Sequence, residues 1–146
     1  MNGSPLRLGA FMPYRFDFDS TNWIARCSLE GRLTEEDVRN CYREAAEFFA
    51  LTGPRAGVFD LTGVISLDFP SQIVYELAKL SPIMADQDRV RVAIAPSAGV
   101  FGMARMFEML GENKRPNLHV VRTAREAWAI LGIREPRFKP LDAAIT

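Results

Sequence analysis

The chain has 146 residues and a mass of 16.4 kDa, and its 18 basic side chains are balanced by 18 acidic ones, so its formal net charge is zero. With 48% hydrophobic and 25% charged residues, the composition is that of a globular protein and excludes wholesale disorder. Because nucleic acids and anionic membrane surfaces attract a basic excess, the zero balance argues against both as general partners. We expect one soluble domain, 1–146.

The first predicted elements form a hairpin. Aromatic residues at 14, 16 and 18 alternate with charged residues, and this period of two indicates a half-buried strand. A turn is predicted at 20–22, and the alternation resumes over residues 23–29, so the two strands are expected to pair. Gly31 is expected to end the second strand.

The rest of the chain is predicted to alternate helices and strands. Thr34 is a good N-cap, and the helix that follows it carries one apolar stripe up to Phe49. The segments predicted after the hairpin are a helix between Thr34 and Gly53, a strand at 56–61, a helix from Pro70 to Met84, a strand at 89–95, a helix between Ser97 and Gly111, a strand at 118–121 and a helix between Thr123 and Gly132.

This β-β-α-β-α-β-α-β-α order predicts an α/β fold. An opening hairpin followed by alternating strands and helices implies a mixed, mostly parallel sheet of about five strands with four helices around it. The predicted core spans residues 14–132. Residues 1–12 and 134–146 lie outside the repeating pattern and are expected to be arms that fray or pack on a neighbour.

The two cysteines and the amino-terminal segment bear on location and metal binding. Cys27 and Cys41 are the only cysteines and form no CxxC pair. The first residues lack an apolar core of signal-peptide length, and no run approaches the ~18 apolar residues of a membrane span. This predicts a cytoplasmic protein with two buried, reduced thiols. With His119 as the single histidine, no zinc site is expected, and neither another metal nor a cofactor is indicated.

Three segments of the chain together resemble the STAS domain, the fold of bacterial anti-sigma factor antagonists. VFDLTGVISLDFPSQIVYEL, at 58–77, is similar to the strand, loop and helix that carry the regulatory serine of that family. APSAGVFGMARMFE at 95–108 and LHVVRTAREAWAIL at 118–131 resemble its later elements, and the run at 102–107 resembles that of the SpoIIAA-like subgroup. The resemblance covers about residues 14–132.

The resemblance implies a non-enzymatic regulatory or ligand-binding module, with a regulatory loop at Asp68 and Ser71 that a regulatory protein partner would contact. Asp68 stands where the family has an aspartate, but Pro70 occupies the phosphoacceptor position and has no hydroxyl. Ser71, one residue further on, could replace it in principle. The alternative is that Asp68 caps the helix and Ser71 is a solvated residue of its first turn.

The helix predicted after Ser97 is apolar around more than one face. Phe101, Met103, Met106 and Phe107 contribute to this, and methionine suits adaptable binding surfaces. A second function is therefore a carrier or sensor of an apolar small molecule or lipid held in a cavity beside this helix. Arg105 either anchors an anionic group of the ligand or pairs with an acidic neighbour. An arm carrying Phe11, Met12 or Phe138, or a second protomer, could also cover the helix.

Polar residues near strand ends are the remaining candidates for a site. Asp60, Asp68 and Ser97 are expected to share the carboxyl edge of the sheet, where open α/β sheets bind ligands. His119 fits an edge strand better than a catalytic role. Since no triad, metal cluster, phosphate loop or pair of catalytic carboxylates can be assembled, we expect no enzyme and no catalytic residue.

The charged residues that sum to a net charge of zero are unevenly distributed along the chain. Acidic residues gather at 17, 19 and 35–37, and basic residues at 114–115 and 134–139. Separated signs would permit docking of a sign-matched protein, or a homodimer with the basic tail of one copy against an acidic face of the other. Neither nucleic acid nor an integral membrane segment is expected, while a peripheral membrane contact is left open.

Overall fold

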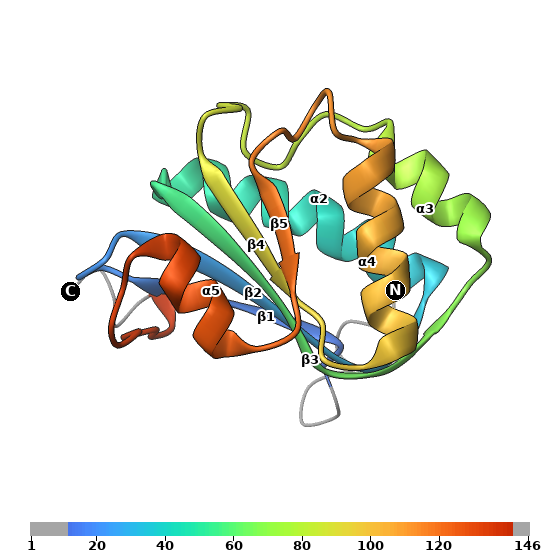
Figure 1. Cartoon of the computed structure of the whole chain (residues 1–146), viewed down its shortest axis with the longest axis horizontal. Coiled ribbons are helices and arrows are strands. Elements are labelled where there is room, and N and C mark those ends of the chain that lie inside the picture. Colours follow the sequence, from blue (N-terminus) through green and yellow to red (C-terminus); the bar gives the residue numbers. More distant parts are fainter. Residues whose placement is uncertain (1–11, 142–146) are drawn as a thin grey trace, which may run out of the picture.

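A computed structural model describes residues 12–141, in which five strands form one mixed sheet (Figure 1). The strand order is β1-β2-β3-β4-β5; β1 and β2 are antiparallel, and every later pair is parallel. The strands are β1 Tyr14–Asp19, β2 Ile24–Thr34, β3 Ala56–Asp68, β4 Val90–Ile94 and β5 Leu118–Val121. The predicted α/β class and mixed five-stranded sheet are therefore confirmed.

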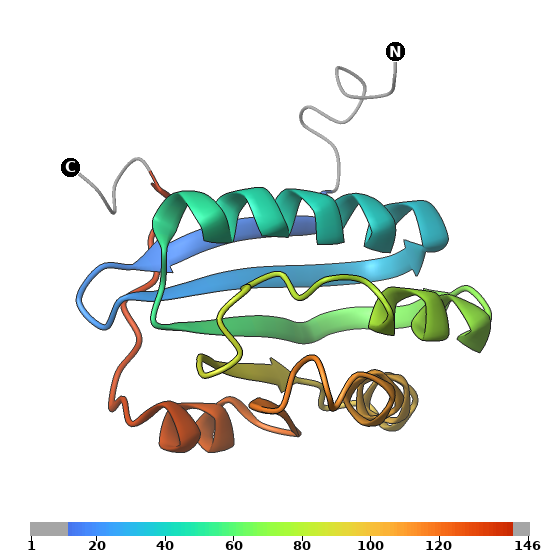
Figure 2. The ribbon, with the colours of Figure 1, turned by 90° about the horizontal axis from the view of Figure 1, so that it is seen from above.

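Four helices pack on the two faces of the sheet. They are α2 Glu35–Thr52, α3 Ser71–Ala78, α4 Ala98–Leu110 and α5 Ala124–Leu131. α2 and α4 share a core cluster with one face of β1, β2 and β3, whereas α5 packs on the other face against Ile24, Val58 and Val92. Seen from above, α3 and α4 lie together at one end of the sheet and α5 lies at the other end (Figure 2).

Two of the predicted helix starts are closed by reciprocal capping boxes. The Thr34 hydroxyl accepts a hydrogen bond from the Asp37 amide at 3.2 Å, and the Asp37 carboxylate accepts one from the Thr34 amide at 2.9 Å. Thr123 and Glu126 make the same arrangement at the start of α5. Pro70 and Ser97 occupy the N-cap positions of α3 and α4 without a side-chain cap bond. The residue types at these four positions therefore predicted where each helix begins.

The two central strands are longer than expected. β2 does not end at Gly31 but continues to Thr34, and β3 continues beyond residue 61 to Asp68. The added pairing includes register shifts at Ser28/Glu30 and Gly31/Arg32, and Gly31 adopts a positive φ of 84°. Gly63 fits because a Cβ there would lie 2.8 Å from the Glu30 Cβ. These bulges depend on the partner strand, so the pattern of β3 alone does not reveal them.

The second predicted helix is shorter than expected. α3 ends at Ala78 instead of reaching Met84, because Pro82 disfavours helical backbone at the residue before it. Residues 79–89 instead form a loop that leads to β4. Met84 belongs to this loop, and its side chain is buried in the core against Phe49 and its neighbours.

The described part of the carboxyl-terminal arm packs on its own chain. Phe18 and Lys139 exchange two backbone hydrogen bonds, at 2.8 and 3.0 Å, which cover the outer edge of β1. The Asp19 carboxylate accepts a hydrogen bond from the Arg137 amide at 2.8 Å, and the Phe138 ring contacts Trp128. Phe138 therefore covers α5 and not α4. Phe11 lies outside the described residues.

Candidate functional site

A cavity of about 200 Å³ lies between the sheet and the helices α2, α3 and α4. Leu29, Phe59 and Ala93 line it from the sheet, while Val74 of α3 and Met103 of α4 line it from the helices. Its lining is apolar except for Tyr42 and two arginines. The cavity therefore offers an apolar molecule a place in the core.

Two sequence periods build these walls. Side chains on one face of a strand recur at every second residue, which brings Arg91 and Ala93 of β4 to the cavity together. On α4 the spacing of Val100, Met103, Ala104 and Phe107 is that of one helical face. Because β4 reaches the cavity with Arg91, its alternation also carries a charge into the core.

Arg91 is buried, with 3% of its surface exposed. Its Nη1 donates to the Arg89 carbonyl at 2.8 Å, and its Nη2 donates to the carbonyls of Met84 and Asp86 at 2.5 and 3.0 Å. All of these acceptors belong to the main chain of the segment that leads into β4. The guanidinium therefore holds the α3–β4 loop against the sheet.

Arg115 is also buried, with 4% of its surface exposed. Its Nη1 donates to the Ala78 carbonyl at 3.1 Å, and its Nη2 donates to the Leu80 carbonyl at 3.0 Å and the Tyr42 hydroxyl at 2.7 Å. Its guanidinium also lies over the Phe107 ring, 4.5 Å from the centroid. Arg115 thus joins the end of α3 to α2 and α4.

Neither buried guanidinium forms an ion pair with a carboxylate in the described range, 12–141. Burial lowers the pKa of Arg91, and the charge of Arg115 lowers it further, while Asp86 acts in the opposite direction. Asp86 is exposed and pairs with Arg89 at 3.4 Å. Among the residues that the structure describes, the cavity lining thus contains two guanidinium groups and no carboxylate.

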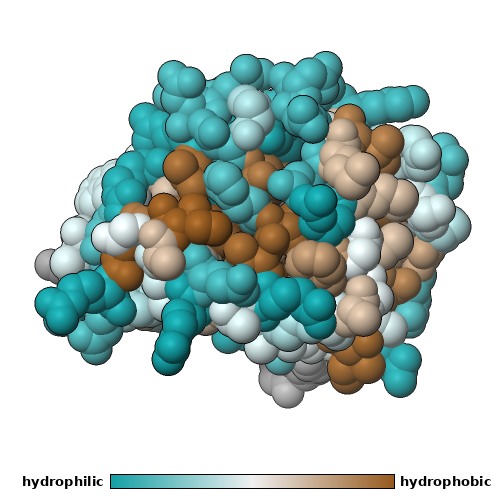
Figure 3. All heavy atoms as spheres, viewed as in Figure 1, coloured by the Kyte–Doolittle hydropathy of each residue, from teal (hydrophilic) through white to brown (hydrophobic). Residues whose placement is uncertain are grey.

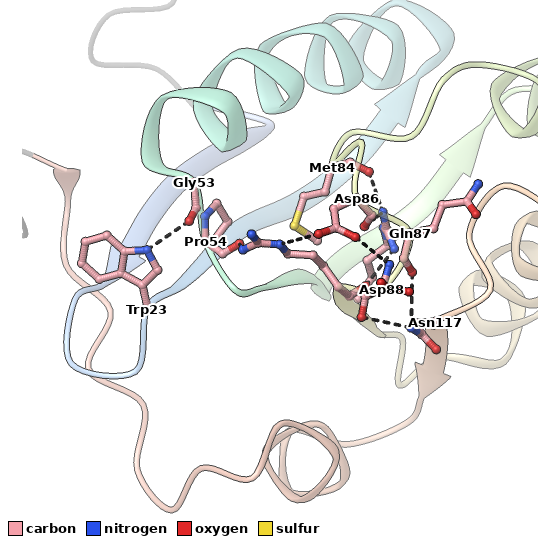
Figure 4. Close-up of polar contacts among 10 residues, drawn as sticks. Trp23, Gly53, Pro54, Met84, Asp86, Gln87, Asp88 and Asn117 are labelled. Carbon is pink, nitrogen blue, oxygen red and sulfur yellow. Dashed lines mark hydrogen bonds and ion pairs between the residues drawn. The ribbon is translucent and has the colours of Figure 1, made fainter.

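The α3–β4 loop is also held by a residue of the segment that precedes β5. The Asn117 side chain donates to the carbonyls of Gln87 and Asp88 at 3.3 and 3.1 Å (Figure 4). Figure 4 shows the Asn117 side chain beside Gln87 and Asp88, with dashed lines for these two hydrogen bonds. Side chains from β4 and from the segment before β5 therefore fix the loop in place.

The structure separates the candidates on α4. Met103 and Phe107 line the cavity, whereas Met106 is half-buried and does not line it. Phe101 packs on the core beside Val100, and the Arg122 guanidinium lies 4.9 Å from its ring centroid. Arg105 is exposed and pairs with Glu108, which is the alternative to its role as a ligand anchor.

Of the polar candidates, Asp60 and Ser97 both lie at the carboxyl end of β4, whereas Asp68 lies away from them. Asp60 pairs in register with Ile94, near the end of β4, whereas Asp68 lies eight residues further along the same strand. Because β3 has two bulges here, the two aspartates are separated by the length of six residues of β2, about 20 Å. Asp68 ends β3 and accepts from the Ser66 hydroxyl, so it does not cap α3. Ser71 is exposed in the first turn of α3.

Ser97, the last of these polar candidates, is exposed at the start of α4. Three charged residues of the clusters read from the sequence are instead buried: Asp19 fully, Arg115 nearly so, and Asp37 at the start of α2. His119 is exposed on the edge strand β5. The proposed separation of surface charge is therefore weaker than the sequence suggested.

The thiols of Cys27 and Cys41 are buried and face each other, with 3.3 Å between the two Sγ atoms. The contact with Cys41 raises the pKa of the Cys27 thiol, and burial and nearby negative charges raise it further. The expectation of buried thiols is confirmed. Cys41 also lines the cavity, so the pair lies beside the candidate site.

Arg91 and Arg115 are the site residues that sequence reasoning missed. The first lies within the strand-like run RVRVAIA, where alternation puts it on the same face as Ala93 and Ala95. That alternation is the signal that could have identified it. Arg115 gives no such signal, because it lies in a polar loop and is buried only by α2, α3 and α4.

On the face shown in Figure 3, apolar side chains gather in the middle of the view, between α4 and α5. No strand pairs with the outer side of β5 in the part of the chain that the structure describes. No helix there is long and apolar enough to cross a membrane, and no group of three metal-ligating side chains occurs among the described residues. Comparisons with family models, curated proteins and solved structures found no match.

Proposed function

We propose that this chain is a non-catalytic binding module that holds a small, largely apolar molecule between its sheet and the helices α2, α3 and α4. The cavity of about 200 Å³ is the observation that carries this proposal. Protein cores are close-packed and contain few voids larger than a water molecule. An apolar molecule that enters this space loses contact with water, and because it binds the folded chain and not the unfolded one, it would stabilise the protein.

The resemblance to the STAS domain supports the same class of function. The observed order of elements is the order expected for that domain, so we propose that the fold is STAS-like. Binding modules of that kind need no catalytic group. The methionine-rich helix α4 supplies Met103 to the cavity, and its flexible side chain adapts to ligands of different shape.

Calorimetric titration with octan-1-ol, a neutral apolar probe, tests the proposal. The wild-type chain should bind it in a saturable manner and unfold at a higher temperature in its presence. Ala104→Phe places a ring in the cavity and should weaken binding at least tenfold, while the free energy of unfolding stays equal or rises because a void is filled.

The matched control is Ala129→Phe, which makes the same substitution at an exposed position of α5 on the other face of the sheet. It should leave octan-1-ol binding unchanged. Absence of saturable binding to the wild-type chain would overturn the proposal. So would equal affinity in the wild-type and Ala104→Phe proteins, once circular dichroism shows that the variant is folded.

A regulatory protein partner is the second candidate, and the extension of β3 favours it. β3 pairs with β4 only up to Asp60, whereas its pairing with β2 continues to Asp68. Residues 61–68 therefore have no strand on their other side in the described part of the chain, and Ile65 is 66% exposed. Strand edges of this kind accept a partner's strand. Asp68 of the proposed regulatory loop ends this edge, and Ser71 begins α3 three residues further on.

Native mass spectrometry of the chain from its source cell distinguishes these candidates. A bound protein should be lost from an Ile65→Asp variant, because a charge is placed in the contact, while a bound small molecule should be retained. A co-purifying protein that remains with the Ile65→Asp variant would contradict docking at this edge.

A further inference from the structure

We propose that the cavity takes a linear monocarboxylate of the fatty-acid type, with its carboxylate at Arg91 and Arg115 and its hydrocarbon chain along the apolar remainder. This inference rests on the proposed function and specifies the class of ligand. It follows from the burial of the two guanidiniums, from their common position at one end of the cavity and from the shape of that cavity.

The first step concerns charge. Arg91 and Arg115 are each more than nine-tenths buried, and their hydrogen bonds go to neutral main-chain carbonyls and to the Tyr42 hydroxyl. Such bonds satisfy N–H groups but do not neutralise two positive charges. Buried charges in proteins are ordinarily paired, because an uncompensated ion in a low-dielectric core is costly. A single anion would compensate both guanidiniums.

The second step concerns position. In the parallel ladder between β4 and β5, Arg91 pairs in register with Leu118, and Arg115 precedes Leu118 by three residues. Both guanidiniums also hold the loop that follows α3, one near its end and the other near its beginning. The charge of Arg115 acts on Arg91 directly enough to lower its pKa. The two cations therefore share one end of the cavity.

The third step concerns shape. Arg91 pairs in register with Gly57 of β3, whereas Leu67, which also lines the cavity, is ten residues further along that strand. Because β3 has two bulges here, this stretch matches eight residues of β2, from Ala25 to Leu33, and spans about 26 Å. Even after the reach of the side chains is subtracted, the lining is elongated. A volume of about 200 Å³ spread along such a length is narrow. A linear chain fits it better than a compact ring system.

The far end of the cavity completes the argument. Its lining there comes from Leu33, Leu67 and Phe69, and all three are apolar. A ligand that crosses the cavity therefore meets cations at one end and only hydrocarbon at the other. An amphiphile with one anionic group matches this polarity, whereas a neutral alkane or a free phosphate would satisfy only half of it.

The experiment compares octanoate with octan-1-ol on the wild-type chain by calorimetry at pH 7. The two probes have chains of the same length and differ in the anionic group. Octanoate should bind at least tenfold more tightly. From butanoate to octanoate the affinity should rise about fourfold per methylene, as expected when each methylene is buried. Inorganic phosphate and acetate should not compete.

Arg91→Met provides the residue-level test, because it keeps much of the side-chain volume and removes the charge. It should reduce the preference for octanoate over octan-1-ol several-fold, because only Arg115 then remains to hold the carboxylate, while octan-1-ol still binds. Arg89→Met is the matched control: Arg89 also contacts Asp86 but does not line the cavity. It should preserve the preference.

The outcomes separate this inference from the proposed function. Equal affinity for octanoate and octan-1-ol in the wild-type chain would overturn the inference and leave an apolar binding module. Absence of binding by either probe would overturn both. If Arg91→Met does not fold, the comparison of the two probes on the wild-type chain decides the question by itself.

Discussion

Gly111, which ends α4, provides a sensitive test of how Arg115 is held. A Cβ at this position would lie 2.6 Å from the Arg115 Nη1 atom and 3.5 Å from the Ala78 carbonyl oxygen. The φ of Gly111 is −107°, so alanine can adopt this backbone. The effect of Gly111→Ala is therefore steric and falls on the buried guanidinium.

The expected cost follows from the bonds that the guanidinium would lose. To escape the added methyl group, Nη1 must move away from the Ala78 carbonyl, now at 3.1 Å. A hydrogen bond that involves a charged group contributes about 1.5–3 kcal/mol. Replacing glycine by alanine also stabilises the folded state by about 0.4–1 kcal/mol, because the unfolded chain loses conformational entropy. We therefore expect Gly111→Ala to lower the free energy of unfolding by about 1–2 kcal/mol.

Gly102→Ala is the control for Gly111→Ala, because the same substitution at Gly102 should have the opposite effect on the free energy of unfolding. It lies inside α4, and a Cβ on it would have no neighbouring atom within 4 Å. Gly102→Ala should raise the free energy of unfolding by about 0.5–1 kcal/mol, through helix propensity. Urea unfolding at 25 °C measures both variants against the wild type. A Gly111→Ala protein as stable as the Gly102→Ala protein would refute this account of Arg115.

Three further predictions concern separate parts of the fold. Burial raises the pKa of Asp19, but hydrogen bonds from Asn22, Arg137 and Thr21 outweigh this effect and hold the pKa below its ordinary value of 3.8. The ionised carboxylate therefore stabilises the folded chain fully above pH 3.8, and this contribution is lost as the pH falls through the lower pKa of the folded state. Asp19→Asn should lower the free energy of unfolding by about 1–3 kcal/mol at pH 7, and urea titrations should show this difference shrinking toward pH 2. Since the pKa of Cys27 is raised and both thiols are buried, a thiol reagent at pH 8 should label the native chain far more slowly than the urea-unfolded chain; equal rates would contradict the burial. The first turn of α3 has no acidic residue, so Ser71→Asp should stabilise by about 0.3–1 kcal/mol and Ser71→Lys should destabilise by a similar amount in low salt, and a shift of the same sign in both would argue against a helix-dipole effect.

The features that the sequence predicted well are local ones. The alternation in β1 and β2, the stripe of α2 and the N-caps Thr34 and Thr123 each depend on residues within one or two turns of chain. Such patterns can be interpreted from the sequence because the interacting residues are close together in the chain, as in the capping box of Thr34 with Asp37.

The features that could not be predicted depend on contacts across the fold. β3 stays paired with β2 up to Asp68 across two bulges, each of which places an extra residue of β3 opposite β2. Asp19 and Arg115 are charged and occur in polar surroundings in the sequence, so their burial becomes evident only when the arm and the α3–β4 loop close over them. Met106 and Met103 are three residues apart on one helix, yet only Met103 lines the cavity.

Native mass spectrometry of the wild-type chain, purified from its source cell under non-denaturing conditions, tests the central claim most directly. The account predicts a retained small molecule, released on unfolding and identified as a linear carboxylate, and predicts that Ala104→Phe lacks it while Ala129→Phe keeps it. A bare chain in all three proteins, combined with no saturable binding of octan-1-ol or octanoate, would contradict the claim that the cavity is a binding site.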